Sequence, residues 1–431
     1  MVSSVDQPST LSRTSRMHYA SGSIATGIFN SVPSALLLYY ATDVVGISPL
    51  WAGCAIGLPK VVGIITDPLI GSLSDGSSRN GRAPFLYTGG IGLAVGLFAT
   101  FSVPPWALEW QRGVYLTLVY SVASLAYGVF AVPYIAIASE LSPDPWERER
   151  VLATRMIALM AGLLMGAAGA PFIVMCAGGG RTGYSIMGAT LAFVALFSTL
   201  CVAAGSARWR RVDSAPSARR SGAHWRVIRS DRGFVFLALA QMSFSGAVAA
   251  VSALLPFIVT RNFGEDEARV GELFLCWIGA SLIAAPIWPG MSRRFGKPVL
   301  LIAIMASFAA MSGIIYCVGP RLDITGLRAT LVLLGALFSG SSVLAYAAMT
   351  DFAVRAARST GANTEGVYSG AWTAFEKIGL ALGPLAAAST FAVFGSSAAT
   401  VQTMMSLIPA SLALAALLIL ALGSPFKTRA I

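Results

Sequence analysis

Long apolar segments alternate with short polar turns along almost the whole chain. A helix needs about 20 apolar residues to cross a bilayer, and segments of about that length recur twelve times. Their approximate limits are 20–41, 49–73, 83–103, 112–139, 151–177, 184–204, 233–260, 269–289, 297–317, 327–349, 366–394 and 399–422. The pattern predicts an all-α membrane protein with twelve transmembrane helices.

One long polar segment, residues 205–232, interrupts this pattern halfway along the chain. It is rich in Arg, Ser and Ala and has no apolar periodicity, so we interpret it as a basic cytoplasmic linker. It separates an N-terminal six-helix bundle (20–204) from a C-terminal one (233–422), with tails at 1–19 and 423–431. Basic, glycine-containing turns at 75–82 and 290–297 occupy corresponding places in the two halves, which indicates an internal repeat.

The charge distribution predicts how the chain crosses the membrane. Only 11 % of the residues are charged and 56 % are apolar, whereas about a quarter of the residues of a soluble domain are charged. With both termini in the cytoplasm, the cytoplasmic side holds 21 of the 30 Lys and Arg and the other side holds 6. This positive-inside bias explains the net charge of +11 without a nucleic-acid partner.

The N-terminal residues are polar and lack an apolar segment followed by a cleavage site. They predict a cytoplasmic tail rather than a signal peptide, and a multi-pass protein of a bacterial-type inner membrane. The five cysteines lie in apolar segments without CxxC spacing, which predicts buried free thiols and no metal site. The sequence has neither HExxH, GxSxG nor a phosphate-binding loop, so we expect no enzyme and no cofactor.

Asp67 is the first candidate for transport chemistry. It follows six apolar or small residues and precedes Pro68, and a carboxylate within a span costs about 2.5–3.5 kcal/mol on insertion scales. Lys60 lies two helical turns earlier on the same face, roughly 10 Å away along the axis. Asp67 is either a structural charge or, as we favour, a group that takes up a proton or ligates a cation, with Lys60 nearby.

The span 366–394 contains Glu376 and Lys377 side by side. Tyr368, Trp372 and Glu376 are spaced by four residues, which we interpret as one stripe. Aromatic stripes are usually packing, but a stripe with a carboxylate favours the wall of a substrate cavity. Three further polar residues within spans are candidates for this cavity, with snorkelling or interhelical hydrogen bonds as the alternative: Asn30, Arg155 and Gln241.

Charged residues also gather in the predicted cytoplasmic turns after the second, fourth and tenth spans. They predict an ion-pair gate, although solvated loop charges would contribute little. The gate candidates are Asp75, Arg79, Arg82, Glu140, Asp144, Arg148, Asp351, Arg355 and Glu365.

Three spans contain glycine pairs at small-xxx-small spacing, which lets helices approach closely. Each pair fits either static packing or a surface on which two bundles rock. The pairs are Gly53 and Gly57, Gly162 and Gly166, and Gly379 and Gly383.

Several stretches resemble the glycoside–pentoside–hexuronide:cation symporters of the major facilitator superfamily. They are YYATDVVGISPLWAG (39–53), ITDPLIGSLSD with RNGR (65–82), VPYIAIASELSPDPWERE (132–149), AYAAMTD (345–351) and TEGVYSGAWTAFEKIGLALGP (364–384). The resemblance implies an alternating-access carrier with a central cavity between two six-helix bundles. It also implies that Asp67 is the cation-site aspartate, with Lys60 nearby, and that Arg155 and Lys377 serve sugar binding or coupling.

The sequence departs from this family at several positions. Sodium-coupled members carry a second acid where this chain has Gly63, so the resemblance favours protons as coupling ions, with sodium possible. The acidic and basic residues that grip the galactoside in melibiose permease are replaced by Thr26, Gly27 and Ala131, and a sugar-stacking aromatic residue is replaced by Ile135. Melibiose-type recognition is therefore not expected.

Three functions remain open at the level of sequence. The leading one is cation-coupled symport of a sugar, glycoside or related small solute by a monomer in the lipid bilayer. A cavity with few polar groups also fits a carrier of lysolipids or other amphiphiles. A non-transporting sensor or assembly factor on the same scaffold is the third, although such a scaffold has no reason to retain Asp67, Glu376 and Lys377.

Overall fold

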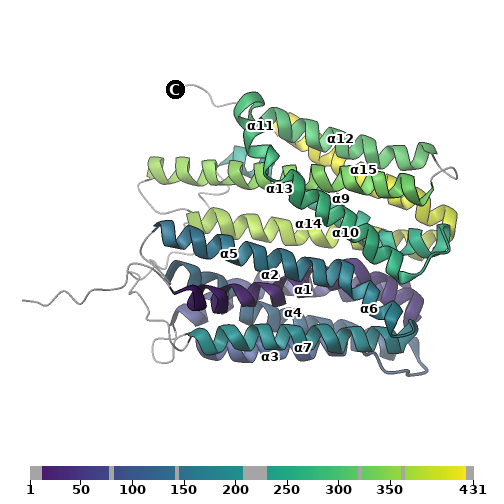
Figure 1. The fold of residues 1–431 in the computed structure, drawn as a ribbon. Coiled ribbons are helices and arrows are strands. Elements are labelled where there is room, and N and C mark those ends of the chain that lie inside the picture. The colour runs from purple at the N-terminus through teal and green to yellow at the C-terminus, as the bar shows by residue number, and fades with distance from the viewer. Residues whose placement is uncertain are drawn as a thin grey trace, which may run out of the picture. The chain divides into compact units, whose positions relative to one another are not determined.

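The fold is seen in a computed structural model, which describes residues 12–76, 82–140, 145–206, 231–318, 323–360 and 365–423. All regular elements in these ranges are helical (Figure 1). The first half of the sequence contains α1 (Arg13–Tyr39), the π-helical turn η1 (Tyr40–Val44), α2 (Pro49–Gly76), α3 (Ala83–Thr100), α4 (Glu109–Glu140), α5 (Pro145–Leu164), the π-helical turn η2 (Met165–Gly169), α6 (Ala170–Cys176) and α7 (Gly180–Ser206). The second half contains α9 (Arg232–Asn262), α10 (Glu267–Ala284), α11 (Ile287–Phe295), α12 (Lys297–Val318), α13 (Ile324–Thr360), α14 (Glu365–Phe394) and α15 (Ala398–Gly423).

The predicted fold class is confirmed. The described residues include 11 helices long and apolar enough to cross a membrane, or 12 if the bent pair of α10 and α11 is one span. This pair corrects the prediction of an uninterrupted eighth span at 269–289. Pro286, in the break between the two helices, has no N–H for a helical hydrogen bond, and the chain bends there by 52°.

Some predicted boundaries also change. Helix α1 begins at Arg13, so part of the predicted N-terminal tail is helical, and α13 continues to Thr360, well past the predicted end of the tenth span. Residues 207–230 of the predicted linker and 424–431 of the predicted C-terminal tail lie outside the described residues. The division into two six-helix bundles is a statement about the sequence repeat and stays a prediction.

By contacts, the chain forms two compact units. Unit 1 groups Met1–Pro33, Val61–Trp106 and Val114–Ala218, and unit 2 groups Ser34–Lys60, Ala107–Gly113 and Arg219–Ile431. Unit 2 therefore contains two segments from the first half of the sequence. Within unit 1 α3 lies beside α7, and within unit 2 α12 lies beside α15 (Figure 1).

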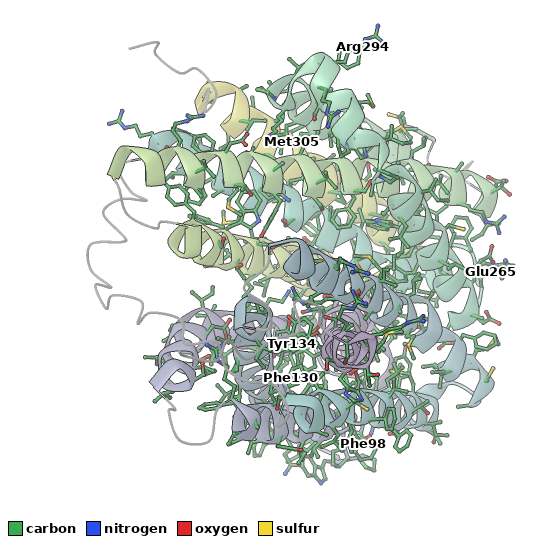
Figure 2. The ribbon with its side chains drawn as sticks, turned by 60° about the vertical axis from the view of Figure 1, so that its left-hand side comes forward. Phe98, Phe130, Tyr134, Glu265, Arg294 and Met305 are labelled. Carbon is green, nitrogen blue, oxygen red and sulfur yellow. The ribbon has the colours of Figure 1, made fainter. Side chains whose placement is uncertain are left out.

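The core of unit 1 is built around an aromatic contact between α1 and α4. Tyr19 and Tyr134 stack with ring centroids 4.8 Å apart. The Tyr134 hydroxyl donates to the Tyr19 carbonyl oxygen at 2.7 Å and lies 2.8 Å from the Ser23 hydroxyl. Phe130, one turn away on α4, stacks on Tyr134 at 5.3 Å (Figure 2). These contacts fix α4 against α1.

Helix α9 is the centre of unit 2. It packs against α10, α13, α14 and α15, and 89 % of its most apolar stretch is buried, compared with 78 % for α1 and 33–50 % for the other spans. Among the 11 single spans of the described residues, α1 and α9, the first and seventh predicted spans, are thus the two most enclosed by protein. This correspondence is what an internal repeat of six helices predicts.

Candidate functional site

Asp67 is half-buried on α2 and lies against α4 within unit 1. A Cβ atom placed on Gly128 of α4 would come within 2.7 Å of the Asp67 carboxylate oxygen Oδ1. The absence of a side chain at Gly128 therefore makes the room in which the carboxylate sits. The predicted role of Asp67 in coupling stays a prediction, but its position against a neighbouring helix is now defined.

Lys60 has its partner on another helix of unit 2. Its Nζ donates a hydrogen bond to the carbonyl oxygen of Leu380 on α14 at 2.7 Å. In an uninterrupted helix this carbonyl would accept from the N–H of residue 384, but Pro384 has none. The ammonium group of Lys60 thus satisfies a carbonyl that the proline leaves without its helical donor.

The predicted stripe on α14 divides into a packed part and an exposed part. Tyr368 and Trp372 are buried, and the Tyr368 hydroxyl donates to Asp231 at 2.9 Å. Glu376 is exposed and has no hydrogen-bond or ion-pair partner among the described residues, whereas the neighbouring Lys377 is half-buried. Residues spaced by four advance by about 40° per step, so over eight residues the stripe turns by about 80°, and Glu376 leaves the face of the two aromatics.

Arg155 of α5 lies against the aromatic core of unit 1. Its guanidinium carbon is 5.6 Å from the centroid of the Tyr134 ring, a geometry that favours attraction between cation and ring. The side chain is half-buried, and its Nε is buried without a hydrogen-bond partner. The arginine is therefore held beside α1 and α4.

The two uncharged candidates differ in position. Asn30 of α1 is exposed and donates through Nδ2 to the Tyr127 hydroxyl of α4 at 3.1 Å. Gln241 of α9 is buried and accepts a hydrogen bond from Ser341 of α13 at 3.0 Å. Gln241 therefore makes the interhelical hydrogen bond that the sequence left open, while Asn30 keeps an exposed position.

The predicted gate can be followed at three of its residues. Asp351 of α13 forms an ion pair with Lys297, which begins α12. Arg355 lies over the ring of Phe352 on its own helix at 5.1 Å, and Arg82 donates to the Pro133 carbonyl oxygen of α4 at 3.3 Å. The other gate candidates lie outside the described residues or have side chains that are not described: Asp75, Arg79, Glu140, Asp144, Arg148 and Glu365.

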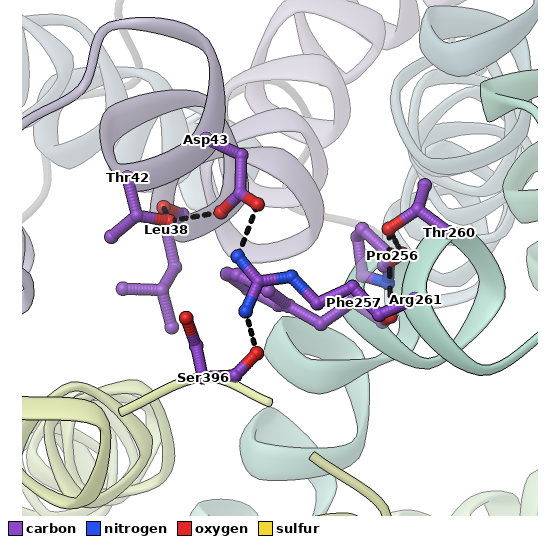
Figure 3. Close-up of polar contacts among 8 residues, drawn as sticks. All are labelled: Leu38, Thr42, Asp43, Pro256, Phe257, Thr260, Arg261 and Ser396. Carbon is purple, nitrogen blue, oxygen red and sulfur yellow. Dashed lines mark hydrogen bonds and ion pairs between the residues drawn. The ribbon is translucent and has the colours of Figure 1, made fainter. Parts of the chain in front are cut away.

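A polar cluster that the sequence did not predict joins the end of α9 to η1. Arg261 forms an ion pair with Asp43 and donates to the Ser396 carbonyl oxygen (Figure 3). Thr42 donates to the second Asp43 oxygen at 2.7 Å. We call Asp43, Arg261 and Ser396 the Asp43 cluster. Both charged residues lie just after the ends of predicted spans, 20–41 and 233–260, but no pattern in the sequence pairs one with the other.

Asp43 and Arg261 come from different halves of the sequence but lie in the same compact unit. Their side chains are 19 % and 25 % exposed, so the ion pair is partly shielded from water. Near it, Arg112 donates to the Val45 carbonyl oxygen at 2.6 Å, and Glu109 accepts from the Ser48 N–H at 2.9 Å. These contacts hold the turn between η1 and α2 against the start of α4.

The cysteines are free, as predicted, but three of them correct the expectation of burial. Cys54, Cys176 and Cys317 are exposed. Each lies on a helix within or at the end of an apolar span, where a small polarizable side chain can face lipid instead of a protein core. Among the described residues no three His, Cys, Asp or Glu side chains gather as metal ligands.

The fold and the charged residues within its spans define a membrane transporter of the major facilitator type. Residues 18–425 match the family described as MFS/sugar transport protein, and the chain belongs to this family. The resemblance to glycoside and cation symporters is thereby confirmed at the level of family. Because family and structural neighbours are transporters, the protein is a multi-pass membrane transporter and not an enzyme.

Several relatives and solved structures are similar to this chain. A putative 2,3-dihydroxypropane-1-sulfonate exporter of Salmonella typhimurium is 25 % identical over 85 % of this chain and 81 % of its own length. The putative glycoside/cation symporter YagG of Escherichia coli is 30 % identical over 43 % of this chain and 42 % of its own. The mouse sphingosine-1-phosphate transporter MFSD2B is 24 % identical over 70 % of this chain and 65 % of its own.

Among solved structures, the nucleoside transporter NupG has a TM-score of 0.70 at 12 % sequence identity and covers 97 % of this chain and 100 % of its own. A bacterial homologue of the lysosomal transporter Spinster has a TM-score of 0.65 at 12 % identity, covering 96 % of this chain and 94 % of its own. At these identities the structural similarity concerns the fold alone.

Proposed function

We propose that the protein is a secondary active transporter that couples the movement of a sugar, glycoside or related small solute to a cation, with protons as the favoured ion. The observation that supports this proposal is the position of Asp67, a half-buried carboxylate within a span that lies against Gly128. A carboxylate within a span costs free energy of insertion. A cycle of proton uptake and release during transport would explain why the chain keeps it. Glu376, exposed and without a described partner, is a second candidate for that cycle.

The choice of protons rests on ligand number. Sodium is bound by several oxygen atoms, and one turn before Asp67 the chain has Gly63, which supplies no side-chain oxygen. A single carboxylate suffices for one proton. In this proposal the carrier works as a monomer of a bacterial-type inner membrane, with both termini in the cytoplasm.

The proposed substrate class rests on the family and on the galactoside-binding side chains of melibiose permease that this chain lacks. A side chain at position 27, where melibiose permease has a galactoside-gripping residue, has no room: a Cβ atom on Gly27 would lie 2.6 Å from the Leu159 carbonyl oxygen. Recognition in this carrier would instead use Asn30, Arg155, Glu376 and Lys377. Galactosides of the melibiose type are therefore weak candidates.

A second candidate function is transport of a lysolipid or another amphiphile. It is favoured by the similarity to MFSD2B, which is named a sphingosine-1-phosphate transporter. Fewer polar groups in the binding site would suit a substrate with fewer hydroxyl groups. The two candidates are separated by the substrate that stabilises the purified protein.

The test begins with a thermal-shift screen of sugars, glycosides and lysolipids on the purified protein. Uptake of the best ligand is then measured in proteoliposomes under a proton gradient and, at fixed pH, under a sodium gradient. We expect proton-driven uptake that Asp67→Asn abolishes and that Asp323→Asn retains, because Asp323 only accepts a hydrogen bond from the N–H of Gly326 at a helix start. Strict sodium dependence, or an unchanged rate and pH profile in Asp67→Asn, would refute proton coupling through Asp67.

A further inference from the structure

Helix α11 does not continue the path of α10. It bends away by 52°, and none of its residues is buried. Ile287 is 56 % exposed and Phe295 is 50 % exposed. Gly296 ends the helix with a φ of +81°, and the apolar helix α12 begins at the next residue. The C-terminal end of α11 therefore lies where the bent pair of α10 and α11, which qualifies as a candidate span only as a pair, turns into the next span.

One side chain holds α11 in this direction. The indole Nε1 of Trp288 lies 3.2 Å from the Ala336 carbonyl oxygen and 3.2 Å from the Ser339 hydroxyl oxygen, both on α13. A Cβ atom on Gly340 would lie 2.5 Å from the Trp288 ring, so the indole rests on the bare backbone of α13. The bend is thus anchored and presents a fixed surface.

The exposed residues of α11 form an amphipathic pattern. Ile287, Met291 and Phe295 are spaced by four and turn by about 80° from the first to the last. With Trp288 they form a broad apolar stripe that covers about 100° of the helix. Arg293 and Arg294 are both exposed. Arg293 lies opposite the stripe, whereas Arg294, seven residues after Ile287, lies at its edge and extends away from the helices of unit 2 (Figure 2). Its guanidinium carbon is 5.3 Å from the Phe295 ring centroid, so cation and apolar surface lie side by side.

Charge at this turn is positive. Lys297 is neutralised by Asp351, whereas Arg293 and Arg294 have no acidic partner among the described residues. Exposed apolar side chains beside adjacent arginines, at the end of one candidate span and before the start of the next, match the pattern of segments that lie in a lipid headgroup layer. Basic side chains at such a surface attract anionic lipids.

We propose that the C-terminal end of α11 lies in the headgroup layer and binds anionic phospholipid, with Phe295 among the upper acyl chains and Arg293 and Arg294 at the phosphates. The occupant is a membrane lipid and not a soluble anion, because Arg294 adjoins an exposed apolar stripe that only lipid would cover. The leaflet is the one that the positive-inside rule predicts to be cytoplasmic. This site lies outside the proposed transport pathway and does not depend on the substrate.

The test uses the full-length protein in nanodiscs and compares retention of phosphatidylglycerol with that of phosphatidylcholine by native mass spectrometry. We expect wild type to prefer phosphatidylglycerol, and Arg293→Gln/Arg294→Gln to reduce that preference roughly tenfold. Arg293→Lys/Arg294→Lys should retain most of it. The matched control Arg13→Gln/Arg232→Gln removes two other exposed arginines and should leave the preference unchanged.

Two results would overturn the proposal. One is an equal preference in wild type and in the double Gln variant. The other is stabilisation of the wild type by inorganic phosphate to the same extent as by phosphatidylglycerol, which would assign the arginines to a soluble anion. A spin label at Phe295→Cys, with the native cysteines replaced, tests the depth with both arginines in place: we expect a headgroup-layer signal, and a fully water-exposed label would contradict the proposal.

Discussion

At the scale of single residues, the most informative contact is the one between Lys60 and Leu380. A lysine within a span is costly, and so is a helix carbonyl without its donor in a medium that lacks water. Pro384 leaves the Leu380 carbonyl without its helical donor. The hydrogen bond from Lys60 Nζ to that carbonyl oxygen, at 2.7 Å, gives a partner to both the ammonium group and the carbonyl. The stabilising role of Lys60 therefore depends on the proline four residues after its acceptor.

This dependence can be measured. We expect Lys60→Met to lower the free energy of unfolding by about 1–2 kcal/mol, because an interhelical hydrogen bond is lost and a carbonyl is left unpaired. In a Pro384→Ala background the new alanine supplies the missing N–H, so the same substitution of the lysine should cost less. Thermal unfolding in detergent of the two single variants and the double variant measures the coupling.

Thr66→Val is the matched control for Lys60→Met, since among the described residues the Thr66 hydroxyl bonds only to the Val62 carbonyl oxygen of its own helix. The loss of unfolding free energy caused by Thr66→Val should be the same with and without Pro384→Ala. Equal costs of Lys60→Met with and without the proline would show that Leu380 is not the reason for the stability provided by Lys60.

At the scale of helices, the three glycine pairs separate into two kinds of contact. Cβ atoms on Gly162 and Gly379 would collide with backbone, at Ile24 and Met242 respectively. A Cβ atom on Gly57 would meet only the side chain of Leu385, at 3.0 Å. The packing at Gly162 and Gly379 is therefore rigid, whereas at Gly57 helix α2 meets α14 through a movable side chain.

The difference predicts unequal effects of alanine substitution. Gly379→Ala should destabilise the protein by about 1–3 kcal/mol, because overpacking against backbone forces helices apart. Gly57→Ala should cost less than half as much, since Leu385 can change rotamer. Thermal unfolding midpoints of the two variants decide between these expectations. Gly370→Ala on α14, with nothing within 4 Å of its Cβ, controls for the change in helix propensity, and similar losses at 379 and 57 would count against two kinds of contact.

The apolar pattern of the sequence was sufficient to predict the spans, because each span must be apolar over its full length. It was not sufficient to predict a helix break or the partner of a single side chain. The bend at Pro286 was not readable from the proline alone, because several other helices continue through a proline, at Pro33, Pro133, Pro256, Pro384 and Pro409. The separation of Glu376 from Tyr368 and Trp372 follows from the helical repeat alone. The partner of Lys60 was not predictable from the sequence, because it is a main-chain carbonyl on a helix far away in the chain. Pro384 is the one sequence feature that points to this carbonyl.

At the scale of the whole molecule, the Asp43 cluster joins the two halves of the sequence within one compact unit. In a carrier whose halves move relative to one another, contacts of this kind exist in one state and are lost in another. Ala388 of α14 is buried and would lie 3.2 Å from a Cβ atom on Gly53 of α2. Exposure of position 388 therefore reports the separation of α2 from α14.

We expect Arg261→Gln to raise the rate at which a membrane-impermeant maleimide labels Ala388→Cys, in a variant without the native cysteines. A partly exposed ion pair contributes about 1 kcal/mol at most, so the increase should be about fivefold. Asp43→Asn should have a similar effect, and the double variant should not exceed either one. Arg269→Gln, which loses only contacts to Glu265 and Glu272, should label like the parent; a parental rate in Arg261→Gln as well would remove the cluster from the conformational cycle.

The enclosure of α1 by protein also bears on how the chain enters the membrane during synthesis. A helix that faces neighbours instead of lipid can carry Ser, Gly and Asn, and α1 has the lowest hydropathy of the candidate spans. The transfer of such a segment from the translocon into the bilayer alone therefore yields little favourable free energy. Stable insertion of the first helix therefore waits for partners made later, and truncated chains that end soon after Tyr39 should leave it only partly integrated.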